Sequence, residues 1–353
     1  MINMESIAAQ VKHNCNISDA RYWGFYSPCG LLLRMRDLYK IERHLDPRED
    51  VNLLKIGEWI DQREGLWQEL EEKSLQPIEI NGRKYDPYDV KGINSVLSDH
   101  NYIYGAGYGN MMKPVFLLAD ISETQHIKKY SIHVTGKEIA RDLSTSPAMT
   151  RGNTIIARQQ TMNFFFWEKF QEMKAKRCNG ALFQAFTEYG LSRDAEKKLS
   201  VKELEEMISK IVRAEITTYI HHELGEASQR RVLGRWWKEL LLKIPYSRAE
   251  LFLRGLKDVS SDTCRTGMLA HIIENRKSGS LGFYAAIFGG FRRTIFPDMV
   301  DAYGKFLLTE DWELIEEARA KGYRNAGDYI RTLKEMFDKG KVSQEAIEGI
   351  MPM

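Results

Sequence analysis

The chain has 353 residues, 43% of them hydrophobic, which is enough to bury the core of one large domain or two modest ones. Lys and Arg number 51 against 49 Asp and Glu, a net charge of +2, which lacks the basic excess of a dedicated nucleic-acid-binding protein. The four cysteines form no CxxC pair, and such sparse usage is typical of a reducing compartment. The N-terminus lacks the apolar core of a signal peptide, and the longest near-apolar run, 281–291, is too short to span a membrane. We therefore expect a cytoplasmic protein with neither a membrane nor a nucleic acid as its partner.

The first 150 residues combine helical and strand patterns. Apolar residues recur at helical spacing over 30–45 and again over 51–72, so both segments are predicted to be helices. Residues 77–85 predict a β-hairpin, because Asn81-Gly82 supplies the two positive φ angles of a type I′ turn.

Strand patterns return further along the chain. Segment 114–121 is a short apolar run and segment 126–134 alternates apolar and polar residues, which together predict a second hairpin or adjacent strands. We expect them to share an antiparallel sheet with residues 78–85. The intervening glycine-rich segment 105–109 has neither GxGxxG spacing nor a following GKS/T, so it is predicted to be a loop without a phosphate-binding role.

A stretch rich in Ser, Thr, Pro and Gly at 143–152 predicts a domain boundary. The fold class is therefore α+β, with a small mixed α+β region at 1–150 and a larger all-α helical domain at 151–353. Helical spacing continues through the second part, so essentially no strand is expected beyond residue 152. The predicted helices cover 154–177, 181–190, 200–242, 247–257, 262–277, 281–307, 310–320 and 326–339.

The helix predicted at 200–242 has a polar stripe on its surface. At about 100° per residue, Glu215, Tyr219, His222 and Glu226 fall within roughly 60° of one another. Apolar residues continue the stripe in both directions, and a polar patch that faces other helices must be paired, metal-bound or hydrated. These four residues are the candidate catalytic groups, for metal binding or proton transfer, and we expect the acids and the imidazole to be buried.

The same helix also permits a plainer interpretation. A second apolar strip lies about 140° away and consists of Ile216, Ile220, Leu224 and Ala227. If the helix buries that strip alone, His222 and Glu226 form an ordinary surface ion pair at i, i+4. A kink at Gly225 or Gly234 would also break the alignment of the polar stripe.

Further metal ligands are available on a later helix, where His271 and Glu274 lie at i, i+3. If the two helices face each other, the ligand set is His222, Glu226, Glu215, His271 and Glu274, which suits iron, manganese or zinc. The alternative is an exposed pair near a helix end. The residues 222–226 lack the second histidine of the HExxH zinc motif.

Two functional hypotheses follow from these patterns. The first is a helical enzyme that uses the Glu/His stripe for metal-assisted redox or hydrolytic chemistry. The second is a non-catalytic interaction or regulatory protein that binds a protein partner or a second copy of itself. Its surface would include the Arg/Trp segment 230–237, although the same mixture also describes Arg stems covering Trp rings between helices.

Overall fold

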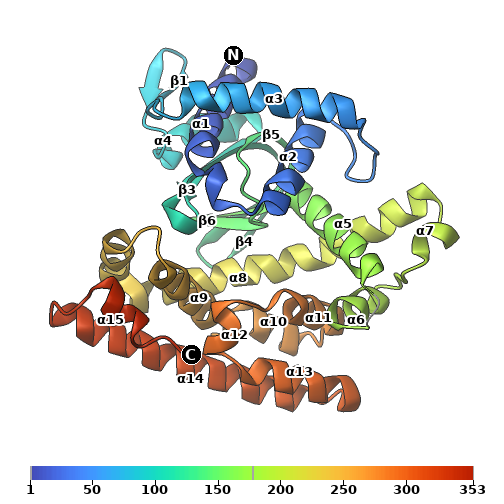
Figure 1. Ribbon diagram of the computed structural model, residues 1–353, viewed down its shortest axis with the longest axis vertical. Coiled ribbons are helices and arrows are strands. Elements are labelled where there is room, and N and C mark those ends of the chain that lie inside the picture. Colours follow the sequence, from blue (N-terminus) through green and yellow to red (C-terminus); the bar gives the residue numbers. More distant parts are fainter. Residues whose placement is uncertain (1, 177–178, 353) are drawn as a thin grey trace. The chain divides into compact units, whose positions relative to one another are not determined.

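The computed structural model describes residues 2–176 and 179–352 and contains two structural units (Figure 1). One unit comprises Met1–Gly109 and Lys113–Trp167, and the other comprises Glu168–Met353 with Asn110–Met112. The first combines helices with small sheets and the second is helical, which is the α+β class that the sequence predicts. No helix in the described part of the chain combines the length and apolarity that crossing a bilayer requires. Cys178 lies outside the described residues.

The elements up to the end of the sheet follow in chain order. They are α1 (Met4–Tyr22), η1 (Trp23–Phe25), α2 (Pro28–Glu42), α3 (Leu53–Leu70), β1 (Ile78–Ile80), β2 (Arg83–Tyr85), α4 (Val90–Leu97), η2 (Ser98–His100), β3 (Tyr102–Tyr108), η3 (Asn110–Met112), β4 (Pro114–Ile127), β5 (Tyr130–Arg141), β6 (Ala148–Arg151) and β7 (Thr154–Arg158). Helix α1 packs against β4 and β5 on one side and α3 on another, and so joins two of the apolar clusters of this unit.

The first hairpin forms as predicted. Asn81 and Gly82 take φ angles of 52° and 77°, and β1 pairs with β2 in antiparallel register. The expectation that this hairpin shares a sheet with the later strands is wrong, because β1 and β2 form a two-stranded sheet of their own. The side chain of Gln10 bonds both the N–H and the C=O of Glu79. The Gln10 side chain therefore occupies the N–H and C=O groups on β1 with which a further strand would pair.

The main sheet has five strands in the order β3-β4-β5-β7-β6. The predicted hairpin of β4 and β5 is confirmed, with register shifts along its length. The predicted glycine loop is instead strand β3. A Cβ on Gly105 would lie 2.6 Å from Met149 Sδ, and one on Gly107 would lie 2.5 Å from Arg151 Nη2. The glycines therefore serve the close approach of β3 to β6, which curls the sheet.

Strand β7 corrects the start of the helix predicted at 154–177, and it is an exception to the expected absence of strands beyond residue 152. It pairs in parallel with β5 and antiparallel with β6, and its residues Ile155 and Ile156 are buried. Helix α5 begins only at Gln159. Because β7 fills the gap between β5 and β6, the first unit extends to Trp167 instead of ending near residue 150.

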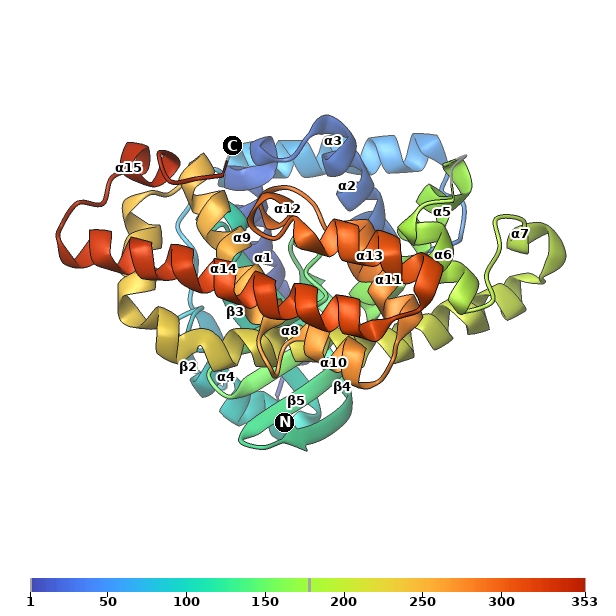
Figure 2. The ribbon, with the colours of Figure 1, turned by 90° about the horizontal axis from the view of Figure 1, so that it is seen from below.

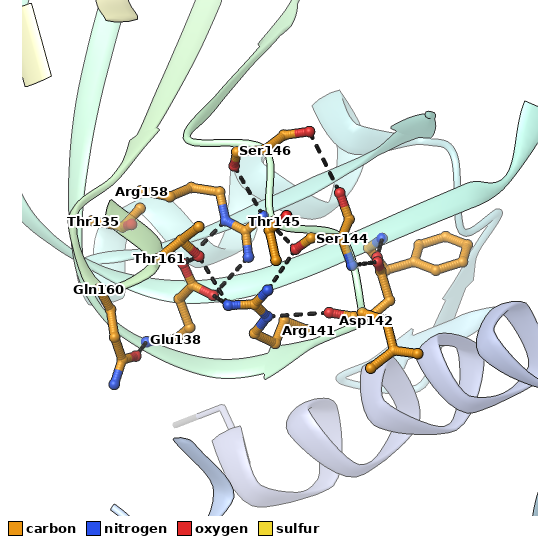
Figure 3. A network of polar contacts seen from close by, with 12 residues as sticks. Thr135, Glu138, Arg141, Asp142, Ser144, Thr145, Ser146, Arg158, Gln160 and Thr161 are labelled. Carbon is orange, nitrogen blue, oxygen red and sulfur yellow. Dashed lines mark hydrogen bonds and ion pairs between the residues drawn. The ribbon is translucent and has the colours of Figure 1, made fainter. Parts of the chain in front are cut away.

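A buried ion-pair network fixes the chain between β5 and β7 (Figure 3). The carboxylate of Glu138 lies 2.6 Å from Arg158 and 3.3 Å from Arg141, and Thr161 donates a 2.7 Å hydrogen bond to it. Both guanidiniums also donate to the carbonyl of Ser144. The segment that the sequence marks as a boundary is therefore a strap held to the sheet by two buried arginines.

Helices make up the remainder of the described chain. They are α5 (Gln159–Ala175), α6 (Ala181–Glu188), α7 (Ala195–Lys198), α8 (Val201–Lys243), α9 (Arg248–Thr263), α10 (Met268–Glu274), α11 (Ser278–Ile287), α12 (Phe291–Ile295), α13 (Asp298–Thr309), α14 (Trp312–Asp338) and α15 (Gln344–Glu348). The helix predicted at 281–307 is divided into α11, α12 and α13, with Gly290 at a φ of 57° between the first two. The two helices predicted over 310–339 form the single helix α14, which packs against α8, α9, α10 and α13 (Figure 2).

Helix α8 packs closely against α9, and this contact positions the polar residues of both. Gly225 stays helical, and its lack of a side chain lets α9 approach, because a Cβ there would lie 2.3 Å from the carbonyl oxygen of Ser261. The interruption of α8 falls at Gly234, where φ is 57° and ψ is −158°. The break predicted between 257 and 262 does not occur, because α9 continues to Thr263. Its buried Ser260 and Ser261 lie at the contact with α8.

Replacing Gly225 with alanine should destabilise the protein by about 1–3 kcal/mol, because the added methyl group meets a backbone oxygen that cannot rotate away. Gly304, whose Cβ position in α13 is open, provides a matched control. There the same substitution should be neutral or stabilising by up to about 1 kcal/mol. Urea unfolding measures both, and equal effects would contradict the close contact.

The Glu138→Gln variant should lose the contribution that the Glu138 carboxylate makes to the pH dependence of the unfolding free energy. The Arg158 and Arg141 charges outweigh burial and hold the pKa of Glu138 at about 2, below its usual 4.5. Because the folded-state pKa is depressed, this contribution of roughly 3 kcal/mol is present above pH 4.5 and is lost as the pH falls towards 2. Unfolding free energies at pH 7 and pH 3.5 should therefore differ less in the variant than in the wild type. An unchanged difference would contradict the assignment.

Candidate metal and proton-transfer centre

Three side chains on α8 and α9 converge at the contact between these helices. His222 and Glu226 lie one turn apart on α8, and Asp258 lies on α9. One donor atom from each falls within 4.8 Å of the others, and all three residues are half-buried. This spacing allows a single cation to reach an imidazole nitrogen and two carboxylate oxygens.

Asp262 orients the imidazole of His222. Its Oδ1 lies 2.6 Å from His222 Nδ1, and its side chain is only 1% exposed. The other ring nitrogen, Nε2, lies 3.5 Å from Glu226 Oε1. Burial alone would lower the pKa of His222, but the charge and hydrogen bond of Asp262, followed by Glu226, raise it well above 6.5. The bond at Nδ1 directs Nε2 towards the cluster.

The two remaining carboxylates differ in their partners. Lys257 Nζ lies 2.6 Å from Glu226 Oε1, and although burial opposes it, Lys257 and then His222 hold the pKa of Glu226 well below its usual range. Asp258 accepts no hydrogen bond and forms no ion pair with any of the described residues. Burial raises its pKa above 3.8 in spite of the nearby Lys257 and His222. Asp258 is thus the group in the cluster with unused bonding capacity.

Glu215 is buried as expected, but it lies in a separate network. Its Oε1 accepts hydrogen bonds of 2.5 Å from Tyr189 and 2.6 Å from Ser280, and the residue is 1% exposed. Tyr219 lies on the same side of α8 and packs against the apolar core, and burial followed by the charge of Glu215 raises its pKa. The competing apolar strip of α8 is buried too, so this part of the helix is covered on both sides.

The two ligands predicted on the later helix lie elsewhere. His271 stacks on His221, with ring centroids 4.0 Å apart, and Glu274 is exposed. His221 is adjacent to His222 in sequence but points about 100° away on the helix surface. The structure therefore brings together His222 and Glu226 of the predicted ligand set.

Sequence reasoning missed the acids of α9 and their neighbour Lys257. Asp258 and Asp262 lie at i, i+4, the spacing that places two side chains on one helix face. The break predicted after residue 257 separated them, and so concealed the face that they share.

Another buried cluster of charge belongs to the first unit and pairs one cation with two carboxylates. Lys113 Nζ lies 2.9 Å from Asp19 and 3.1 Å from Asp142, and all three side chains are buried. The carboxylate of Asp142 also accepts the backbone N–H groups of Phe116 and Ser144. Because Lys113 bridges an aspartate of α1 and the aspartate that follows β5, this cluster fixes α1 to the sheet.

The Trp rings of the Arg/Trp segment lie between helices, as the alternative interpretation expects, but the arginines of the segment are exposed and it is Lys334 that lies over Trp236. Trp237 is 3% exposed, and the ring of Trp236 lies 5.7 Å from that of Phe337 on α14. Its aromatic side chains therefore belong to a contact between helices, which removes the stacking groups from this proposed binding surface.

Comparison with known proteins gives two matches, both to domains of one family. Residues 6–158 match the N-terminal domain, and residues 163–352 match the C-terminal domain, of a family described as a family of unknown function, DUF6866. The chain belongs to the DUF6866 family. All residues of the α8–α9 centre lie in the part that matches the DUF6866 C-terminal domain. No curated protein matches the chain, and no solved structure does.

The contact between His222 and Asp262 predicts a strong coupling in stability. His222→Gln should cost about 3–5 kcal/mol, because it leaves the carboxylate of Asp262 buried without its cationic partner. The double variant with Asp262→Asn should recover part of that loss, since the unpaired charge is gone. Urea unfolding of the two single variants and the double variant measures the coupling. Additive effects would show that the two side chains do not interact.

Proposed function

We propose that the C-terminal unit is a metal-dependent enzyme, whose divalent cation is held by His222, Glu226 and Asp258 and supports hydrolysis. The convergence of three donor atoms within 4.8 Å, one of them on a carboxylate without a partner among the described residues, carries this proposal. An imidazole with two carboxylates is a donor set for zinc, manganese or iron.

The composition of the site supports a catalytic role over a structural one. Structural zinc sites are closed by four protein ligands, commonly cysteines, whereas catalytic sites keep a position for water or substrate. Here the three candidate ligands leave such a position. When bound, the cation would lower the pKa of a water molecule and polarise the bond to be cleaved.

The neighbouring residues have separate roles in this proposal. The hydrogen bond from Asp262 fixes the ring orientation and tautomer of His222, as carboxylates commonly do for histidine ligands. Lys257 keeps a positive charge beside Glu226, where it can stabilise negative charge that develops in a transition state. The half-buried placement of His222 and Glu226 gives solvent access to one side of the centre.

A non-catalytic interaction protein is the second candidate. Three apolar side chains of α13 support it, because Val300, Leu307 and Leu308 are 39%, 45% and 86% exposed. This surface is compatible with a protein partner or a second copy of the chain. It does not account for the convergence of His222, Glu226 and Asp258, so the metal-dependent enzyme remains the better-supported proposal.

Elemental analysis of protein purified without a metal-affinity tag tests the proposal. We expect about one equivalent of manganese, iron or zinc in the wild type, and loss of it in His222→Gln and Asp258→Asn. Asp262→Asn should keep the ligands but weaken metal binding by about 10- to 100-fold in a titration with Mn²⁺.

The double variant His271→Gln with Glu274→Gln is the matched control. It removes one histidine and one acid of the same unit that lie outside the cluster, so its metal content should equal that of the wild type. Metal-free wild-type protein that also fails to bind added Mn²⁺ or Zn²⁺ would refute the metal centre. Equal loss in the control would place the metal at a different site.

A further inference from the structure

A buried hydroxyl without a hydrogen-bond partner lies beside the proposed centre. Tyr284, on α11, is 2% exposed, and its Oη forms no hydrogen bond within the described residues. Burial, followed by the charge of Asp262, raises the pKa of this hydroxyl, and the carboxylate of Asp262 lies close to it without meeting hydrogen-bond geometry. Because the carboxylate of Asp262 already bonds His222, it serves the Tyr284 hydroxyl poorly, and a bound acceptor at this position would complete the hydrogen bonding of the hydroxyl.

A second donor, the guanidinium of Arg292 on α12, is also incompletely paired. Its Nη2 donates to the carbonyl of Ile287, and it forms no ion pair with a carboxylate among the residues that the structure describes. The side chain is half-buried. A guanidinium has five N–H donors, and one backbone carbonyl uses only part of that capacity.

Both donors lie near the face of α9 that carries the acids. A Cβ on Gly255 would lie 3.5 Å from the backbone nitrogen of Arg292, so α12 packs directly on α9 at that residue. Gly255, Asp258 and Asp262 lie at i, i+3 and i+7, which is one helix face. The rings of Tyr284 and Phe288 stack with their centroids 5.4 Å apart, and the guanidinium carbon of Arg292 lies 5.9 Å from the centroid of the Phe288 ring. Both donors therefore pack against the same phenylalanine.

An anionic ligand would supply the acceptors that Tyr284 and Arg292 lack, and its charge would be attracted by Arg292 and by a bound cation.

We infer that the centre binds the oxyanion of its substrate, a phosphoryl or carboxylate group, between the metal and the donors Arg292 and Tyr284. This inference rests on the proposed function and specifies its substrate class. The planar guanidinium of Arg292 matches two oxygens of either group. The hydroxyl of Tyr284 would donate to a further oxygen of a phosphoryl group, or to a remaining lone pair of a carboxylate oxygen. The hydrolysable substrate would then be a phosphate ester or a molecule with a carboxylate beside the bond that breaks.

Calorimetric titration of the Mn²⁺-loaded full-length protein tests the inference, with inorganic phosphate and acetate as separate probes. Wild-type protein should bind at least one of them. Arg292→Gln should weaken that binding by about tenfold or more, and Tyr284→Phe by several-fold. The preferred probe distinguishes a phosphoryl from a carboxylate substrate.

Arg293→Gln is the control, because it removes the same charge from the neighbouring, exposed position of α12. It should leave anion binding unchanged, and so excludes a general charge effect. Tyr284→Phe should not lower the melting temperature, since its hydroxyl has no partner to lose. If Arg292→Gln unfolds, Arg292→Lys replaces it and should still weaken binding, because an ammonium lacks the planar pair of donors.

The outcomes separate this inference from the proposed function. Mn²⁺ bound by the wild type, with no anion binding or equal anion binding in Arg292→Gln and Arg293→Gln, would overturn the inference alone. Failure to bind Mn²⁺, with phosphate or acetate binding that still depends on Arg292, would refute the metal centre and support the oxyanion site. Loss of both would reject the two together.

Discussion

The close approach of α8 to α9 is the constraint on which the centre depends. The backbones meet where Gly225 leaves space for the carbonyl of Ser261, and this contact brings Asp262 within 2.6 Å of His222. A larger residue at Gly225 would separate the helices, and the imidazole and the carboxylate would each lose the partner that makes burial tolerable. One glycine therefore links the packing of the helical unit to the chemistry that its polar residues can perform.

The distribution of partners distinguishes this centre from the other buried polar clusters. In the sheet-containing unit, Glu138 is matched by two arginines and Lys113 by two aspartates, so these groups serve stability and fix the connections of the sheet. Around α9 the pairing is incomplete, because Asp258 and Tyr284 have no partner among the described residues. Buried groups with unused capacity are costly, and a bound cation and anion would satisfy them.

Local patterns predicted the fold class and several elements directly. The Asn81-Gly82 turn and the β4–β5 hairpin follow from neighbouring residues, and both form as expected. Strand β7 was not predicted from local patterns, since its pairing with β5 joins segments about twenty residues apart. Strand β3 was not predicted either, because its glycines serve a contact with β6. Such elements depend on tertiary packing, which the periodicity of one segment does not contain.

Two of the four side chains of the candidate centre and its hydrogen-bonded neighbour could be predicted from the sequence. The stripe on α8 identified His222 and Glu226, because helical spacing places them on one face. Asp258 and Asp262 lie on one helix, α9, which the sequence predicted to end at residue 257, before both of them. Only the packing at Gly225 shows that they face α8. Glu215 shares the stripe but bonds Tyr189 and Ser280, so spacing alone does not determine which neighbours a side chain meets.

The most direct test of the metal centre is anomalous diffraction from crystals soaked in Mn²⁺. The account predicts an anomalous peak about 2.0–2.6 Å from donor atoms of His222, Glu226 and Asp258, with the bond between His222 Nδ1 and Asp262 retained. A peak elsewhere, or an ion pair of Glu226 with Lys257 and no manganese beside Asp258, would contradict it.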